Sequence, residues 1–217
     1  MLLIEQGIPQ EKLFVIHNSL DYDIQKAIRE NIKTSSIYND HFQNSSPTII
    51  FIGRLTKVKK LDMIVDALAR LRNKGEKYNM VFVGDGSESD NLKVKVKSLD
   101  LNDQVWFYGA SYDEKTNAEL IYNADLCVSP GNVGLTAMHA LIFGCPVITH
   151  NYFEWQMPEY EAIHAGNDID DLIATISKWF AVKSDKREEV RKACFKEIDT
   201  NWNPYYQMDI IKKNIKF

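Results

Sequence analysis

The chain has 217 residues, of which 45% are hydrophobic and 26% are charged; this composition excludes a disordered chain, and the length suits one large domain rather than two. The formal net charge at pH 7 is −4, which argues against a nucleic-acid-binding surface because phosphate backbones are bound by clustered Lys and Arg. No apolar stretch approaches the roughly 20 residues of a membrane-spanning helix, and the first residues lack the basic start of a signal peptide.

The first 46 residues predict a segment that leads into the main domain. Gly7 and Pro9 mark the end of a helix, and a short strand is expected over residues 13–16. Residues 34–46 are polar and rich in Ser and Asn, which is typical of a connecting loop. We therefore predict an entering strand and a connecting loop in residues 1–46.

From residue 47 to residue 198, short apolar runs alternate with longer stretches of helical periodicity. Strands are expected at residues 48–52, 80–83, 105–108, 125–128 and 146–149, and helices at residues 61–72, 89–99, 114–123, 135–143, 170–181 and 186–198. Most of the strands are apolar throughout, as parallel strands covered on both faces are. The pattern predicts an α/β fold, a single Rossmann-like doubly wound parallel sheet, followed by a C-terminal helix in residues 199–217, centred on 205–215.

Three cysteines are present, Cys127, Cys145 and Cys194, and their spacing is not that of a metal site. Cys127 and Cys145 lie within apolar runs. We interpret them as buried, reduced thiols of a cytosolic protein.

The loop after the first predicted strand is a candidate phosphate site, because ligands of doubly wound sheets bind beyond the carboxyl ends of the strands. Gly53 permits a sharp turn there, and Arg54 and Lys59 supply two cations that suit a diphosphate. Alternatively, the lysines of this loop belong to a solvated helix start.

Two further loops follow strands. Gly84 and Gly86 form a tight turn that lacks the GxGxxG pattern of dinucleotide-binding proteins. After the fourth strand, a loop containing Gly131 and Gly134 opens directly into a helix, whose free amides form an anion site. His139 falls about one turn inside that helix, where it either contacts a ligand or packs as a structural histidine.

These pieces occur in a specific order: IIFIGRLTKVKKLDMIVDAL, MVFVGDGSE, VWFYG and YNADLCVSPGNVGLTAMHALIFGCPVIT, preceded by FVIHNSLD. In this order they resemble the C-terminal, donor-binding domain of the family-4 (group 1) glycosyltransferases, which have the two-domain GT-B fold. The resemblance covers about residues 48 to 150.

The resemblance implies a role for each matching position. Arg54 and Lys59 match the catalytic pair that binds the diphosphate of the donor and stabilises its leaving charge. The turn at Gly53, Gly84 and Gly86 lies under the nucleotide, the backbone of Phe107, Tyr108 and Gly109 reads the base, and the amides of Val133, Gly134 and Leu135 cradle the distal phosphate. No metal and no cofactor is implied.

The sequence departs from the family at two positions. The family carries two glutamates eight residues apart, where this chain has Gly131 and His139. The first glutamate normally holds the donor sugar and the second the ribose. Gly131 cannot replace a carboxylate, Asn132 is a candidate substitute, and His139 can still hydrogen-bond a ribose.

The implied activity is that of a retaining hexosyltransferase, which moves a sugar from a UDP- or GDP-sugar to a glycan or lipid-linked acceptor in cell-surface polysaccharide synthesis. We expect it in the cytoplasm, peripherally bound at the inner face of the membrane. The acceptor would bind an N-terminal domain that this chain lacks, so the isolated chain is expected to be inactive. The alternatives are a degenerate nucleotide-binding module, a nucleotide-sugar epimerase and a dinucleotide oxidoreductase.

Overall fold

The computed structural model describes residues 2–16, 18–150 and 163–214. Its centre is a six-stranded sheet with the strand order β3-β2-β1-β4-β5-β6, in which every neighbouring pair is parallel. The strands are β1 Thr48–Ile52, β2 Asn79–Val83, β3 Val105–Gly109, β4 Leu126–Ser129, β5 Val147–Thr149 and β6 Ile163–His164. The predicted α/β fold with one doubly wound parallel sheet is therefore confirmed.

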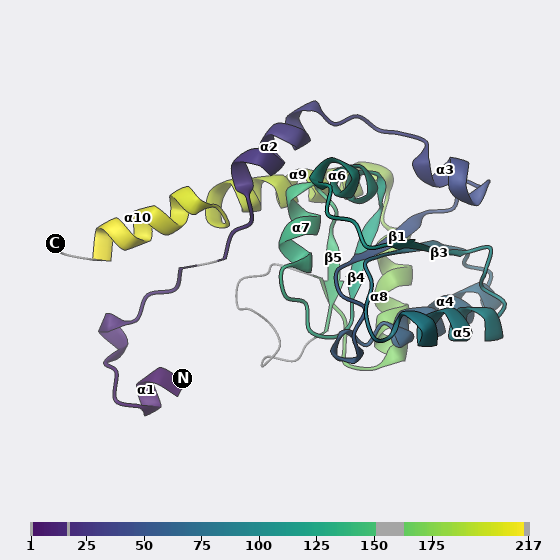
Figure 1. Cartoon of the computed structure of the whole chain (residues 1–217), viewed down its shortest axis with the longest axis horizontal. Coiled ribbons are helices and arrows are strands. Elements are labelled where there is room, and N and C mark those ends of the chain that lie inside the picture. Colours follow the sequence, from purple (N-terminus) through teal and green to yellow (C-terminus); the bar gives the residue numbers. More distant parts are fainter. Residues whose placement is uncertain (1, 17, 151–162, 215–217) are drawn as a thin grey trace.

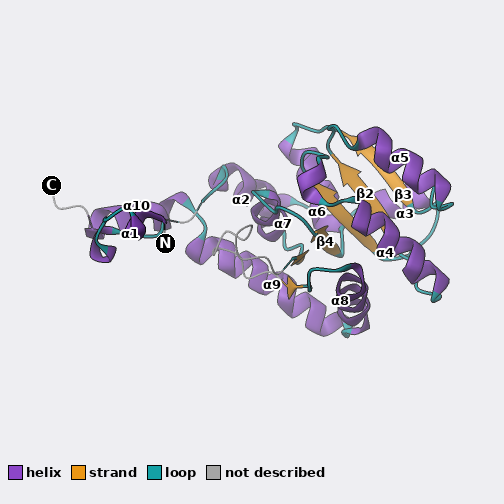
Figure 2. Cartoon of the chain, turned by 90° about the horizontal axis from the view of Figure 1, so that it is seen from below, coloured by secondary structure: helices purple, strands orange, loops and turns teal. Residues whose placement is uncertain are grey.

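Helices cover both faces of the sheet (Figure 1). On one face lie α4 Asp62–Asn73, α5 Ser89–Ser98 and α8 Ile169–Ala181, and on the other lie α6 Glu114–Asn123, α7 Thr136–Ile142, α2 Tyr22–Asn31, α3 Ile37–Phe42 and α9 Ser184–Asn201. The short helix α1 Leu2–Glu5 and the C-terminal helix α10 Pro204–Asn214 extend away from the sheet, as both views show (Figures 1 and 2). None of the helices described is both long and apolar enough to cross a bilayer.

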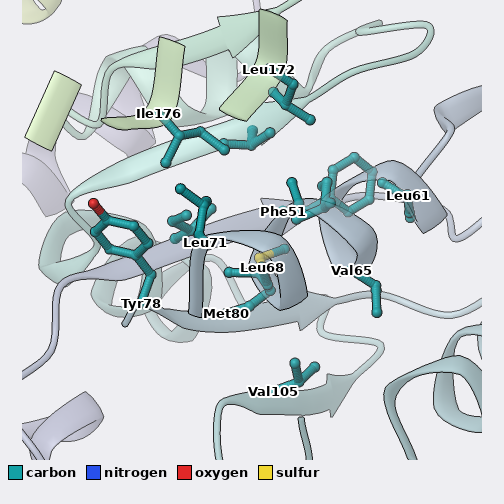
Figure 3. Packing of buried hydrophobic residues seen from close by; sticks show 14 of the residues in the cluster. Phe51, Leu61, Val65, Leu68, Leu71, Tyr78, Met80, Val105, Leu172 and Ile176 are labelled. Atoms are coloured by element: carbon teal, nitrogen blue, oxygen red, sulfur yellow. The ribbon is translucent and has the colours of Figure 1, made fainter. Parts of the chain in front are cut away.

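The first face is held by a continuous apolar core (Figure 3). Leu68 and Leu71 of α4 pack onto Phe51 and Met80 of the central strands, and Ile176 of α8 closes the cluster. The helix expected over residues 61–72 is confirmed, and its apolar face is turned to the sheet: Leu68 is 2% exposed and Leu71 is fully buried. All three cysteines are free and buried as predicted, and burial raises the pKa of Cys127 to about 12.

The prediction for residues 1–46 was wrong in two respects. No strand forms over residues 13–16; these residues lie outside the sheet, and Phe14 and Val15 are 51% and 62% exposed. The polar stretch at 34–46 contains α3 instead of a continuous loop, because Tyr38 is buried and donates from its hydroxyl to the carbonyl of Leu120 on α6. Helix α2, which was not predicted, packs against α6 and α7.

The predicted boundary between residues 198 and 199 was also wrong, because it falls inside α9. That helix runs on to Asn201, since Ile198 and Trp202 are buried in the second core cluster and only Pro204 starts a new helix. Smaller differences are a start of β2 at Asn79 and the addition of β6. Residue 215, the end of the predicted last helix, lies outside the described residues.

Candidate functional site

A cavity of about 330 Å³ opens at the carboxyl ends of β1, β2 and β3. It is lined by Gly53 and Arg54 after β1, Gly84 and Asp85 after β2, residues 110–112 after β3, and Asn117 and His139 from the helices. The structure thus brings together four of the predicted site residues from three separate segments of the chain: Gly53, Arg54, Gly84 and His139. A larger hollow of about 690 Å³ lies between α2 and α6 and contains none of the predicted residues.

The turns after β1 and β2 touch backbone to backbone, which is why glycine is needed there. Gly84 has φ +140°, and a Cβ at this position would lie 1.9 Å from the carbonyl oxygen of Gly53. A Cβ at Gly86 would lie 2.4 Å from the carbonyl oxygen of Leu55. Hydrogen bonds from Gly53 N to Val83 O (2.9 Å) and from Leu55 N to Asp85 O (3.0 Å) close the contact. Side chains are therefore excluded from this part of the cavity floor.

The loop after β4 is pinned to the loop after β1. Gly131 N donates to Lys59 O (3.0 Å) and Asn132 N donates to Val58 O (2.9 Å). A Cβ at Gly131 would lie only 2.1 Å from Val58 O. No side chain fits at Gly131 unless the two loops move apart, so the carboxylate that the resemblance implies for this position cannot be accommodated in this arrangement.

The two predicted cations have different surroundings. Arg54 is exposed at the cavity, and its guanidinium has no hydrogen bond or ion pair within the described part of the chain. Lys59 Nζ donates to the carbonyl oxygens of Asn132 (2.6 Å) and Val133 (3.2 Å), and burial lowers its pKa. Arg54 is thus available to an anion, whereas Lys59 is already bonded to the loop after β4 and holds that loop in place.

Helix α7 places His139 at the cavity. The helix begins at Thr136, whose hydroxyl donates to Ile52 O at the end of β1 (2.8 Å). Three residues later, His139 Nε2 lies 2.8 Å from Glu114 Oε1 at the start of α6. The prediction that His139 sits about one turn inside a helix is confirmed, but its contact with a ribose stays a prediction.

The residues after β3 differ from those expected. The side chain of Phe107 stacks on Phe82 with ring centroids 5.3 Å apart, and Tyr108 packs against the second core cluster. Gly109 accepts a hydrogen bond from Gly84 N at 2.8 Å, and it is the next three residues that line the cavity. Base reading by the backbone of residues 107–109, like phosphate binding by the amides of Val133, Gly134 and Leu135, stays a prediction.

Sequence reasoning missed three polar residues near the cavity: Asp85, Glu114 and Asn117. The sequence did contain a signal for Glu114 and Asn117, because Asp is a preferred N-cap residue and Asp113 precedes both. In the structure the carboxylate of Asp113 caps α6 by accepting from Thr116 N at 2.9 Å. This cap places the start of α6 directly after β3, at the ligand-binding edge. In the described ranges, no group of three or more His, Cys, Asp or Glu side chains could hold a metal ion.

Comparison with known proteins identifies the family. The family "Glycosyl transferases group 1" matches residues 37–196. The chain is 25% identical over 153 residues to a 2-deoxystreptamine glucosyltransferase of Streptomyces kanamyceticus, which covers 69% of this chain and 39% of the relative. It is also 30% identical over 112 residues to an alpha-monoglucosyldiacylglycerol synthase of Streptococcus pneumoniae. This matched region covers 50% of the chain and 25% of the relative.

Solved structures show the same fold. A glycosyltransferase from Rickettsia africae superposes with a TM-score of 0.76 at 19% identity, over 99% of this chain and 62% of that protein. HepE from Anabaena, solved in complex with UDP-glucose, superposes with a TM-score of 0.71 at 18% identity, over 97% of this chain and 59% of that protein. The chain thus spans less than two thirds of each of these relatives. Since the family match extends over most of its length, the chain belongs to the group 1 glycosyl transferases.

Proposed function

We propose that the chain is the donor-binding part of a retaining hexosyltransferase that uses a UDP- or GDP-sugar. The observation that carries this proposal is the cavity at the strand ends, where the guanidinium of Arg54, which has no side-chain partner among the described residues, meets the glycine turns and His139. A fixed cation above a floor without side chains suits a nucleoside diphosphate. That HepE was solved with UDP-glucose supports the choice of donor class.

In the proposed reaction, the bond between the sugar carbon and the diphosphate oxygen breaks while an acceptor hydroxyl oxygen bonds to the same face of that carbon, and the hydroxyl proton passes to the leaving diphosphate. The negative charge that develops on the leaving diphosphate is what the protein has to stabilise. Arg54 provides a positive charge for this task. Lys59 contributes a second positive charge and keeps the loop before α7 in position. We expect no metal to be required.

The acceptor is proposed to be a glycan or a lipid-linked sugar, used in cell-surface polysaccharide synthesis in the cytoplasm at the inner face of the membrane. Support comes from the relatives' names, one of which is a glucosyldiacylglycerol synthase. The acceptor site is proposed to lie in a further domain, because the chain spans only part of its relatives.

Calorimetry with UDP and GDP tests the donor site. We expect one of the two nucleotides to bind the wild-type chain and Arg54→Ala to weaken this binding by tenfold or more, since a charged hydrogen bond contributes about 1.5–3 kcal/mol. Lys57→Ala is the matched control, because Lys57 is an exposed cation of the same loop that does not line the cavity. Absence of binding to the wild-type chain, or equal affinity in the Arg54 variant, would overturn the proposal.

A second candidate is a nucleotide-binding module without transferase activity. The tight packing at Gly131 favours it, because no carboxylate can occupy the position that holds the donor sugar in relatives. Turnover of a nucleotide sugar by the complete protein, with product analysis in the presence and absence of acceptor, separates the two candidates. The same assay detects an epimerase, which would convert the sugar without an acceptor.

A further inference from the structure

Three helices meet at one carboxylate beside the cavity. Gln25 of α2 is 3% exposed, and its Nε2 donates to Glu114 Oε1 at 2.7 Å. His139 Nε2 of α7 lies 2.8 Å from the same oxygen. The side chains of His139 and Glu114 are 21% and 30% exposed, and of the two it is His139 that lines the cavity.

The chemistry of the carboxylate decides which ring nitrogen carries the proton. Burial alone would raise the pKa of Glu114, but the hydrogen bonds from His139 and Gln25 outweigh it and the pKa is lowered. An ionised carboxylate only accepts hydrogen bonds, so His139 Nε2 must be the N–H donor. In a neutral imidazole Nδ1 is then the acceptor, and it has no hydrogen-bond partner in the described ranges.

We infer that Glu114 is a positioning residue of the donor site: it holds His139 as the Nε2–H tautomer, so that Nδ1 accepts a hydrogen bond from a hydroxyl group of the bound nucleotide sugar. The nature of this ligand rests on the proposed function. A nitrogen that accepts a hydrogen bond can pair with a hydroxyl group but not with an ionised phosphate oxygen, because that oxygen has no proton to donate. The diphosphate is therefore expected to bind Arg54 and not His139. Gln25 donates to the same oxygen of Glu114 and so helps to hold the carboxylate in place.

The tautomer can be measured on the chain without any ligand. Long-range ¹H–¹⁵N spectra recorded over a pH series distinguish the two neutral ring forms, and His139→Gln identifies the signal among the five histidines. We expect the Nε2–H form in the wild-type chain, a mixture in Glu114→Ala, and the wild-type form in Glu114→Gln, whose amide oxygen can still accept. An Nδ1–H ring in the wild-type chain, or an unchanged ring in Glu114→Ala, would refute the positioning role.

Binding of UDP or GDP, whichever the wild-type chain binds, tests the second half of the inference. We expect Glu114→Ala to weaken binding about fivefold to tenfold, as loss of one hydrogen bond does, and to reduce the preference for that nucleotide over its 2′- and 3′-deoxy analogues. In the His139→Ala background the same change should have no further effect. An equal effect in both backgrounds would contradict coupling through His139.

Glu119→Ala is the matched control, since Glu119 lies on the same helix but faces the hollow between α2 and α6. It should change neither the ring form nor the affinity. The two proposals also fail separately. If neither nucleotide binds the wild-type chain, the proposed function fails, whereas the tautomer still decides whether Glu114 positions His139.

Discussion

At the scale of single residues, the two cations of the loop after β1 divide their tasks. Arg54 is exposed and has no side-chain partner within the described part of the chain, whereas Lys59 donates to two carbonyl oxygens of the loop before α7. One of these two hydrogen bonds is exposed and the other is partly buried; together they stabilise the geometry of the loop, and their loss leaves the partly buried carbonyl oxygen of Val133 without this partner. The two residues should therefore respond differently to substitution.

We predict that Lys59→Ala lowers both the stability of the fold and the affinity for nucleotide. The lost hydrogen bonds should cost about 1–3 kcal/mol of unfolding free energy, because the loop at 131–133 loses its anchor. Arg54→Ala should lower affinity alone. Urea unfolding and calorimetry on both variants check this, and equal stability losses would show that the tasks are not divided.

Gly131 provides a second prediction at this scale. Gly131→Glu introduces the carboxylate that the resemblance implies for this position, but its Cβ would lie 2.1 Å from Val58 O. We expect a loss of about 1–3 kcal/mol or more in unfolding free energy, because backbone must move to admit the side chain. The control is Asn132→Glu, which adds the same charge at the next, exposed position and should be tolerated. Normal stability of Gly131→Glu in thermal unfolding would contradict the packing argument.

At the scale of elements, polar contacts hold α2 to two other helices, α9 and α6. Arg29 NH2 lies 2.9 and 2.8 Å from the two carboxylate oxygens of Asp199 on α9, and Tyr22 donates to the same carboxylate at 2.9 Å. Gln25 reaches Glu114 from the same helix. Helix α2 therefore contacts the site through Glu114, and it contributes no residue to the cavity at the strand ends.

We predict that Asp199→Ala destabilises the fold by about 1–3 kcal/mol. Arg29 has a side chain that is only 10% exposed, and removing Asp199 leaves its charge without a carboxylate partner. The matched control is Asp170→Ala, which breaks an exposed ion pair with Arg70 (side chains 84% and 52% exposed) and should change stability by less than about 0.5 kcal/mol. Chemical unfolding of both variants measures the difference, and similar losses would show that α2 is not anchored through Asp199.

At the scale of the whole molecule, both faces of the sheet carry a continuous apolar core within this chain. The chain nevertheless spans 62% of the Rickettsia protein and 39% of the Streptomyces enzyme. A sheet with both faces covered is the unit that folds independently, whereas a transferase needs an acceptor site as well. Folding of this chain and sugar transfer by it can therefore be tested separately.

We predict that the isolated chain unfolds cooperatively and binds nucleotide but transfers no sugar. The unfolding transition can be followed by circular dichroism, and transfer by release of UDP or GDP from a nucleotide sugar in the presence of candidate acceptors. A full-length homologue from the same family serves as the positive control for the assay. Sugar transfer by the 217-residue chain itself would show that its acceptor site is complete.

Much of the fold and part of the site follow from the sequence alone. Uniformly apolar runs predict the strands of a buried parallel sheet, and the glycines and Arg54 that follow them are placed at the ligand edge by the direction of the strands. These signals are local, or depend only on topology. Helix α2 could have been predicted, because Ile24, Ala27 and Ile28 follow the spacing of an amphipathic helix. Helix α3 has only six residues, too few to show a periodicity, and only contacts such as that of Tyr38 with α6 reveal its buried side.

The tertiary structure alone decides how side chains pair across the fold. Gln25, Glu114 and His139 are far apart in the sequence, and their contacts arise only when α2, α6 and α7 pack on one face. Tertiary contacts also decide that Arg54 and Lys59 have different surroundings and that no side chain fits at Gly131. Both features depend on the contact between the loop after β4 and the loop after β1. Residue type and spacing determine which chemistry is available, but hydrogen-bond partners and steric room are properties of non-local contacts.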